Sequence, residues 1–447
     1  MHASSSGSSA NDTSPTPSAA GSAASLDPSA MSAGATMPTD DSSKLKTFLG
    51  ILKKFVGVSD IATVRFSLPA QLLEPQPNLE YWNYLDRPET FVSIGDSEDP
   101  LERMLAVLRF WFTKDLKYVK GKPCKPYNSV LGEFFRCNWE VEDNLLPALS
   151  PSPGEATNTV NKEPLKPVKV SYLTEQTSHH PPVSAFYVDC PEKGISARGF
   201  DQISAKFTGT SIRVTPGAHN LGIFITLHNR ENEQYQLTHP AAYLGGLLRG
   251  ALSVTVSDVC YITCPKTKIK VILHYLEEGW LGKTLHRVDG VVFKYDPEND
   301  TKSKIKDVPE ADILARIEGS WVDKIFVTLP GSTDKILLVD LNPLLPVSKI
   351  VPLDEDQLPN ESRKFWAEVT RAIHARDFGK ATQLKHEIEE RQRQKAAAWS
   401  SRNEEWKPRF FVGTVTPVGR PSLTKDGEEA LRGLHEGRYK LQPSVDV

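Results

Sequence analysis

The sequence is poor in cysteine, and its five cysteines lack the paired spacing that holds a metal ion. Cys260 and Cys264 are four residues apart, in a segment that we expect to be a strand. An odd set of this kind fits buried thiols in a reducing compartment better than a disulfide framework or a zinc site. The sequence therefore predicts an intracellular protein with no metal or other cofactor; its cysteines are Cys124, Cys137, Cys190, Cys260 and Cys264.

Long hydrophobic runs are also absent. No stretch approaches the roughly 18 to 20 consecutive apolar residues that a membrane-spanning helix needs, and the N-terminus lacks the basic and apolar regions of a signal peptide. The net charge of −3 gives no overall attraction to nucleic acid or to anionic membranes. We therefore expect contacts with membranes to be transient and any anion-binding site to be local.

Residues 1–43 contain no lysine or arginine and consist mainly of Ser, Ala, Thr, Pro and Gly. Such a segment buries too little apolar surface to offset the entropy of ordering, so we expect a disordered tail. A mitochondrial transit peptide is not expected either, because it would be rich in arginine.

A short amphipathic helix is expected directly after this tail. Its apolar residues recur at helical spacing, whereas Lys44, Lys46, Lys53 and Lys54 lie off the stripe. Such a helix commonly packs on a core, and it can equally lie on a membrane surface. The pattern leaves both interpretations open for the stripe Leu45, Phe48, Leu49, Leu52, Phe55 and Val56.

The next part of the chain is expected to be helical over residues 77–119. The clearest amphipathic piece is 100–112, and Pro100 suits a first helical turn. Residues 144–167 are rich in Pro, Ser and Asn and are expected to form a surface loop.

Residues 168–341 contain one strand pattern after another. Turn signals recur at short spacing, and several runs alternate in polarity, such as 268–275 and 324–329. This pattern is typical of a large antiparallel sheet, which usually closes into a barrel or splits into two sheets. A closed barrel of this size can hold a ligand cavity.

The C-terminal part is expected to contain helices from 361 and over 378–398, with little order past about 415. Lys385, Glu389 and Arg393 stand at i, i+4 and i+8, so they form one stripe about 12 Å long on a helix. A stripe of this composition is usually a solvated, salt-bridged face.

The octapeptide Glu175–Pro182 (EQTSHHPP) lies between two strand patterns, 168–174 and 183–188. Pro181 and Pro182 lack N–H donors, so we expect them to hold His179 and His180 in an extended segment outside regular pairing. A His-His pair is often a satisfied structural pair or part of a solvated loop.

This octapeptide resembles the signature of the oxysterol-binding-protein-related lipid-transfer family. Tyr127 and Ser129 replace a commoner Leu and Pro in the family's second motif, and 361–366 and 406–411 are similar to further family segments. The resemblance covers about residues 44–415, and no pleckstrin-homology-like segment precedes it, as in short forms of the family. The positions that match the second motif are Lys125, Pro126, Asn128, Leu131, Gly132 and Glu133.

The resemblance implies an α+β fold: a large near-complete antiparallel β-barrel with a lipid tunnel, an N-terminal helical lid and a helical C-terminal region. The implied division is a disordered tail 1–43, a lid segment 44–75, a lipid-binding barrel domain 76–415 that includes the C-terminal helices, and a poorly ordered tail 416–447. Lid residues would be Leu45, Phe48, Leu49, Leu52, Phe55, Ser67, Leu68 and Pro69.

The resemblance also implies a phosphoinositide-headgroup site at the tunnel mouth. A phosphate monoester offers three acceptor oxygens, which an arginine fork, lysine point charges and imidazole N–H groups can engage. A glutamate there fits inositol hydroxyls and can hold the cations in place, and an asparagine can serve either group. The implied residues are Lys125, Asn128, His179, His180, Lys385, Glu389 and Arg393.

The expected function is that of a monomeric cytosolic carrier, which takes a sterol or a phospholipid such as phosphatidylserine in exchange for phosphatidylinositol 4-phosphate. It would act peripherally at intracellular membranes such as endoplasmic reticulum contact sites. One alternative is a lipid sensor that transports nothing. Another is a phosphoinositide phosphatase, against which stands the lack of a Cys-x5-Arg loop, a Gly-x-Ser-x-Gly elbow and a His-Glu-x-x-His helix. We therefore expect no enzyme.

Overall fold

The computed structural model describes residues 41–62, 70, 73–120, 125–145, 149, 167–247, 252–276, 286–402 and 405–443. Of the expected lid residues, Ser67, Leu68 and Pro69 lie outside this part, as does Cys124. Among the described residues, no helix combines the length and the apolar character that crossing a bilayer requires.

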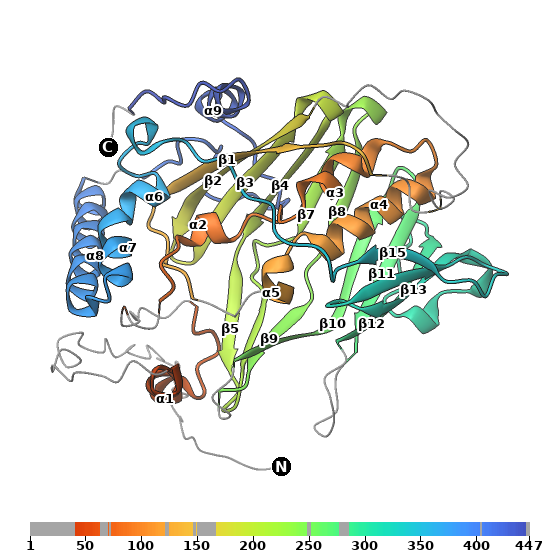
Figure 1. Cartoon of the computed structure of the whole chain (residues 1–447), viewed down its shortest axis with the longest axis horizontal. Coiled ribbons are helices and arrows are strands. Elements are labelled where there is room, and N and C mark those ends of the chain that lie inside the picture. Colours follow the sequence, from red (N-terminus) through yellow and green to blue (C-terminus); the bar gives the residue numbers. More distant parts are fainter. Residues whose placement is uncertain are drawn as a thin grey trace, which may run out of the picture.

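One antiparallel sheet dominates the described chain (Figure 1). Its main path runs β1-β2-β3-β4-β7-β8-β10-β11-β12-β13-β14-β15, and a branch pairs β5 with β6, β6 with β9 and β9 with β10. This confirms the expectation of strand after strand from 168 to 341. The strands are β1 Phe134–Val141, β2 Val168–His179, β3 Pro182–Cys190, β4 Ile195–Asp201, β5 Ile203–Phe207, β6 Ile212–Pro216, β7 Ile223–Leu227, β8 Glu233–Leu237, β9 Ala241–Gly245, β10 Ser253–Cys264, β11 Ile269–Tyr275, β12 Arg287–Lys294, β13 Ile313–Ser320, β14 Lys324–Thr328 and β15 Ile336–Asp340.

The sheet does not close, so the expected near-complete barrel is not confirmed. Its path begins at β1 and ends at β15, and these two strands are not paired in the described structure. The edge of β1 is used otherwise: Asn138 and Ile350 exchange backbone hydrogen bonds of 2.8 and 2.7 Å. A segment from the C-terminal part thus occupies the β1 edge, where closure would have required β15.

A layer of short helices lies against the sheet (Figure 1). It comprises α2 Asn78–Tyr81, α3 Pro88–Val92, α4 Pro100–Thr113 and α5 Leu116–Lys120. Asp99 caps α4 by accepting from the Glu102 N–H at 2.9 Å, and Pro100 is its first residue, as expected. The apolar side of α4 packs into the main core, where Met104, Leu105 and Leu108 are fully buried with side chains of the strands.

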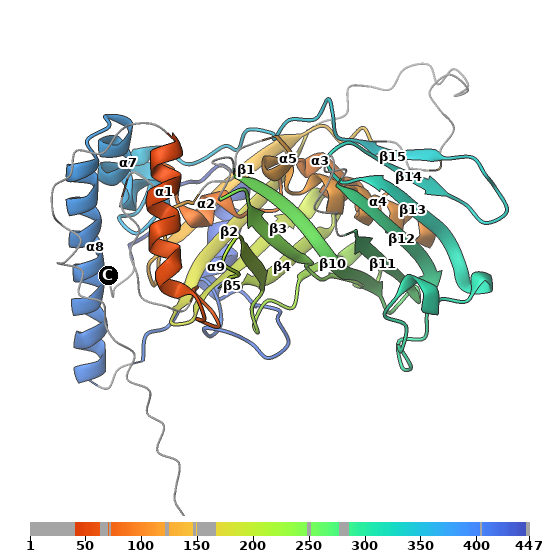
Figure 2. The ribbon, with the colours of Figure 1, turned by 90° about the horizontal axis from the view of Figure 1, so that it is seen from below.

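The expected amphipathic helix is present as α1 Asp41–Leu52, extended by a short 3-10 turn, Lys53–Phe55. Leu52 and Phe55 are buried, and Phe48 and Leu49 pack partly buried against the same cluster. Val56, the last residue of the expected stripe, is 64% exposed instead, because the chain leaves the helix there. Figure 2 shows α1 beside the C-terminal helices α7 Ala367–His374 and α8 Phe378–Ser401.

The C-terminal part forms α6 Ser362–Phe365, α7 Ala367–His374, α8 Phe378–Ser401 and α9 Lys425–His435. Helix α9 contradicts our expectation of little order past about 415. Thr424 caps it, and Ala430, Leu431 and Leu434 are buried. The Asn138 side chain on β1 donates to the Leu434 carbonyl at 2.7 Å. The helical spacing of these apolar residues, flanked by charges, was a signal of amphipathic packing that the Pro/Gly content obscured.

Candidate functional site

The two histidines of the octapeptide form the end of a β-hairpin. β2 runs to His179 and β3 begins at Pro182, and these two residues are partners in the register. His179 is thus the last paired residue of β2, which corrects our expectation that both imidazoles lie outside regular pairing. His180 and Pro181, joined by a cis bond, form the turn. The imidazole centroids are 4.6 Å apart, and His180 is exposed.

Buried neighbours hold this turn in place. Glu175 is 1% exposed, and its carboxylate accepts from the backbone N–H groups of Arg409 at 2.8 Å and Phe410 at 2.9 Å. Burial raises the pKa of the Glu175 carboxyl to about 7. The Thr177 hydroxyl donates to the Thr414 carbonyl at 2.6 Å. The octapeptide is therefore held by hydrogen bonds to a C-terminal segment that is far away in the sequence.

The second motif presents Lys125 and Asn128 together on the surface. The Lys125 ammonium donates to the Asn128 side-chain oxygen at 2.5 Å, and both residues are exposed. Between them Tyr127 points inward, stacks on Trp366 with ring centroids 4.8 Å apart, and shares a 3.0 Å hydrogen bond with the Thr370 hydroxyl. The tyrosine at this position therefore ties the motif to α6 and α7.

Glu133, at the end of the same motif, is fully buried. It accepts hydrogen bonds from the Val130 N–H at 3.0 Å, the Ser362 hydroxyl at 2.7 Å and the Trp366 indole at 3.0 Å. Burial raises the pKa of the Glu133 carboxyl to about 7. Glu133 thus joins the start of β1 to the first C-terminal helix.

Helix α8 carries the third group, and Asp377 caps its start by accepting from the Lys380 N–H at 3.0 Å. Lys385 is 6% exposed and pairs with Glu389 across one helical turn, at 2.9 Å. Arg393, one turn further on, is more than half exposed and pairs with Glu390 at 2.7 Å. The side of α8 that carries Lys385 is therefore turned toward the domain, and the Arg393 turn faces solvent.

One framework links the three motifs. The backbone of Gln176 bonds to Gly132 and Glu133, which joins the octapeptide to the second motif. Tyr127 and Val130 of the second motif share a buried apolar cluster with Ile388 of α8 and with Leu52 and Phe55 of the lid. The structure thus attaches all seven expected headgroup residues to one unit through their neighbours. Sequence reasoning had not assigned a positioning role to Tyr127, Glu133, Glu175 or Thr177; of the two acids, only Glu133 stands between non-polar residues, Gly132 and Phe134.

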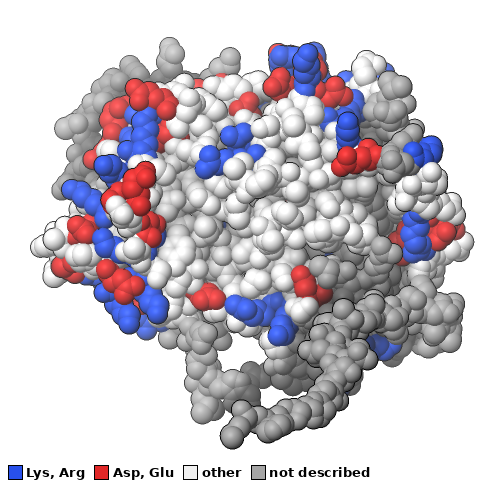
Figure 3. Space-filling view, turned by 180° about the vertical axis from the view of Figure 1, so that it is seen from behind, with Lys and Arg blue, Asp and Glu red and all other residues white. Residues whose placement is uncertain are grey.

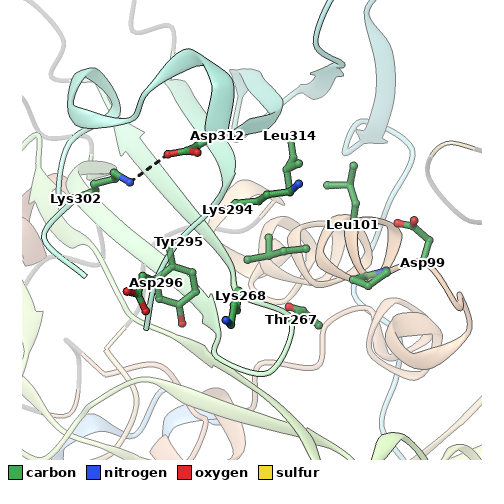
Figure 4. Close-up of a pocket in the computed structure, with 12 residues that line it drawn as sticks. Asp99, Leu101, Thr267, Lys268, Lys294, Tyr295, Asp296, Lys302, Asp312 and Leu314 are labelled. Carbon is green, nitrogen blue, oxygen red and sulfur yellow. Dashed lines mark hydrogen bonds and ion pairs between the residues drawn. The ribbon is translucent and has the colours of Figure 1, made fainter. Parts of the chain in front are cut away.

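Two pockets of the described structure are lined by none of the seven residues. One lies beside this unit and the other elsewhere in the domain. The nearer one, of about 900 Å³, is lined by residues 74–77, Glu80 and one side of α6 and α7. The other, of about 650 Å³, lies between the start of α4 and strands β11–β13; Figure 4 shows Lys302 paired with Asp312 at one side of it. Its charged side chains are of both signs, so it has no anion-binding character.

Charged side chains on the rear face gather around its periphery, whereas its centre is largely uncharged (Figure 3). No continuous basic surface covers this face in the described part of the chain. On this face any anion site must therefore be local, which agrees with the small net charge.

The matching family model and the similar curated proteins indicate the same family for this chain. The family model described as "Oxysterol-binding protein" matches residues 47–371. The chain is 44% identical to "Oxysterol-binding protein-like protein 1" of Schizosaccharomyces pombe, over 89% of this chain and 92% of that protein. It is 32% identical to human "Oxysterol-binding protein-related protein 9", over 77% of this chain but only 44% of that protein's length.

Solved structures share the fold. The ORD domain of Osh1 in complex with ergosterol superimposes with a TM-score of 0.62 at 19% identity, covering 89% of this chain and 90% of that chain. The ORD of Osh3 from Saccharomyces cerevisiae in complex with PI(4)P gives a TM-score of 0.59 at 16% identity, covering 91% and 95%.

Proposed function

The chain belongs to the oxysterol-binding protein family, and we propose that it binds and transfers membrane lipids. The observation that supports this most directly is that the seven expected residues all keep the residue type of the family's headgroup motif, and that their neighbours in the chain are joined by one buried cluster and by backbone hydrogen bonds. The seven are Lys125, Asn128, His179, His180, Lys385, Glu389 and Arg393. Its relatives in solved structures hold ergosterol in one case and PI(4)P in another.

The proposed headgroup ligand is phosphatidylinositol 4-phosphate. Lys125 and Asn128 offer a cation and an amide side by side on the surface, next to a segment bonded to the octapeptide. His180 is exposed at the hairpin end, and Arg393 presents a planar fork at the surface of α8. In this proposal the Glu389 carboxylate accepts hydrogen bonds from inositol hydroxyls. It also holds Lys385 in place, because the Lys385 ammonium donates to it at 2.9 Å.

The second cargo is proposed to be a sterol or a phospholipid such as phosphatidylserine, exchanged for the phosphoinositide between intracellular membranes. Burying each CH₂ gains roughly 0.8 kcal/mol relative to water, but a lipid leaves an equally apolar bilayer, so an apolar tunnel adds little preference of its own. Selectivity then depends on the headgroup and on the fit, and the protein's apolar interior keeps water away from the chains in transit.

Helix α1 is proposed to be the lid of this carrier. It packs through Leu52 and Phe55 on the cluster that also holds Tyr127 and Ile388, so the lid and the headgroup framework touch the same side chains. A movement of α1 then changes the packing around the headgroup framework, and the reverse, which suits a lid that closes on cargo and opens at a membrane.

The site assignment is tested by His179→Ala combined with His180→Ala. We expect this variant to lose phosphatidylinositol 4-phosphate binding in vesicle assays while its unfolding transition stays within a few degrees of the parent. The matched control is His219→Ala with His274→Ala, which removes one histidine from the loop before β7 and one from β11 and should bind normally. Unchanged binding in the folded His179/His180 variant would sink the assignment.

Transport and sensing are separated by a second measurement. Donor vesicles that carry the phosphoinositide and acceptor vesicles that carry a fluorescent sterol or phosphatidylserine are mixed with catalytic amounts of protein. Exchange that stops in the His179/His180 variant supports transfer, whereas tight binding without exchange supports a sensor. Native mass spectrometry of protein purified from its own cells identifies the second cargo.

A further inference from the structure

A hairpin whose loop is uncharged up to Gly419 follows α8 and contacts the octapeptide. Residues 411–423, here called the valine hairpin, close where Val412 donates to the Ser422 carbonyl at 2.9 Å and Phe411 bridges to Leu423. From Phe410 to Gly419 the sequence FFVGTVTPVG has no charged residue, and Arg409 and Arg420 flank it.

The base of the valine hairpin is rigidly held. Phe410 and Phe411 are each 1% exposed and pack in a cluster with Phe134 and Leu173. Within the loop, the Thr414 carbonyl accepts from Thr177 of the octapeptide at 2.6 Å. The loop is thus joined by one hydrogen bond to a residue that lies two positions before His179.

The valine hairpin exposes apolar side chains both at its closing pair and near its tip. Val412, at the closing pair, is 55% exposed, and Val418, near the tip, is 60% exposed. Leu221, 38% exposed, adjoins them, because its Cβ lies only 2.8 Å from where a side chain on Gly419 would begin. Single exposed apolar residues are common on proteins, but a rigid uncharged loop that presents several of them beside a ligand site is typical of an interaction surface.

We propose that the valine hairpin is a membrane-docking element that inserts its tip into an anionic lipid surface beside the headgroup being bound. The inference rests on the proposed function: a headgroup anchored in a bilayer reaches the His179–His180 turn only when the bilayer surface approaches it. A loop bonded to the same turn must then meet the same surface, and an uncharged apolar tip suits that position.

Charge on the preceding helix favours an anionic surface over a protein partner. From residue 391 to 402 the end of α8 carries four cations and no acid, and all four are exposed. This end is separated from Phe411 by only eight residues, a span of roughly 30 Å at most. Lysine and arginine next to an inserting element add attraction to anionic lipids; the cations are Arg391, Arg393, Lys395 and Arg402.

The test is co-sedimentation of the full chain with phosphatidylcholine/phosphatidylserine vesicles that contain no phosphoinositide. We expect Val412→Asp with Val418→Asp to lower vesicle partitioning at least roughly tenfold, because two apolar contacts are replaced by charges that repel anionic lipid. Affinity for a water-soluble, short-chain phosphatidylinositol 4-phosphate should stay within twofold of the parent. The matched control is Leu345→Asp with Leu353→Asp, whose leucines are 65% and 64% exposed on another segment, and it should partition normally.

The inference would be overturned by unchanged partitioning of the Val412/Val418 variant or by an equal loss in the Leu345/Leu353 control. A change in the oligomeric state of the Val412/Val418 variant on ultracentrifugation would also overturn it, because the hairpin would then bind a second copy of the chain. Loss of soluble-headgroup affinity in the Val412/Val418 variant would also overturn it, since the hairpin would then act through the site. If the parent chain binds vesicles through the hairpin but no phosphoinositide at all, the proposed function fails and the docking element stands.

Discussion

At the scale of single residues, the buried carboxyls are as informative as the exposed cations. Glu133 and Glu175 touch no candidate ligand position directly; each accepts hydrogen bonds from a segment remote in the sequence. A carboxyl in such a position organises the motifs around it, because every donor it satisfies is fixed in place. In the proposed site, their role is to position the side chains of their own motifs.

Glu133 predicts a specific pH dependence of stability. Its pKa is raised to about 7 in the folded protein from an ordinary 4.5. Its contribution to the free energy of unfolding is therefore fully present below about pH 4.5 and is lost as pH rises through 7. In the parent protein the free energy of unfolding should decline between pH 5 and 8, and Glu133→Gln should reduce the slope of this decline by up to about 1.4 kcal/mol per pH unit. Urea unfolding at several pH values measures the slope. Glu298→Gln, at an exposed turn, should leave the slope unchanged.

Tyr127 predicts a graded loss of stability. Tyr127→Phe removes only the hydrogen bond to Thr370 and should cost about 0.5–1.5 kcal/mol. Tyr127→Ala also removes a buried ring stacked on Trp366 and should cost about 3–5 kcal/mol. Chemical denaturation measures both. Equal effects of the two variants would contradict the packing that joins the second motif to α6 and α7.

At the scale of elements, α1 and α9 show what determines the position of an amphipathic helix. Both have apolar residues at helical spacing, and both bury them against elements distant in the chain. For α1 the sequence left open whether the apolar stripe would meet the core or a membrane. The structure places Leu52 and Phe55 in the protein's own apolar cluster, and in the proposed function this is the closed position of the lid.

The lid predicts a difference between two neighbouring substitutions. Leu52→Ala with Phe55→Ala should speed the loss of bound lipid several-fold, because the buried contacts that hold α1 in place are removed. Val56→Ala, at a side chain 64% exposed, should leave the rate unchanged. Release of fluorescent lipid to excess acceptor vesicles gives both rates. Equal rates in parent and double variant would show that α1 is no lid.

At the scale of the whole molecule, lid, second motif and α8 share one apolar cluster, and the octapeptide is tied to it through the backbone of Gly132 and Glu133. A ligand that engages all three motifs therefore stabilises the entire domain and not a single loop. Stabilisation of this kind follows mass action.

This coupling predicts that phosphatidylinositol 4-phosphate raises the unfolding temperature. At a ligand concentration 100 times its dissociation constant, the gain is about 2.7 kcal/mol. We expect a shift of a few degrees by calorimetry in the parent protein, growing with ligand concentration, and none in the His179→Ala, His180→Ala variant. A shift that persists in that variant would place the ligand elsewhere.

The sequence by itself determined the strand-rich middle of the chain, the α4 start at Pro100, the amphipathic helix α1 and the family, because these depend on local periodicity or on short motifs. Only the tertiary structure decided the rest. That the β1 edge pairs with Ile350, that Glu175 holds Phe410, and that α9 packs on β1 are all matters of long-range contact. No local pattern specifies such contacts, since each depends on where a segment hundreds of residues away comes to lie.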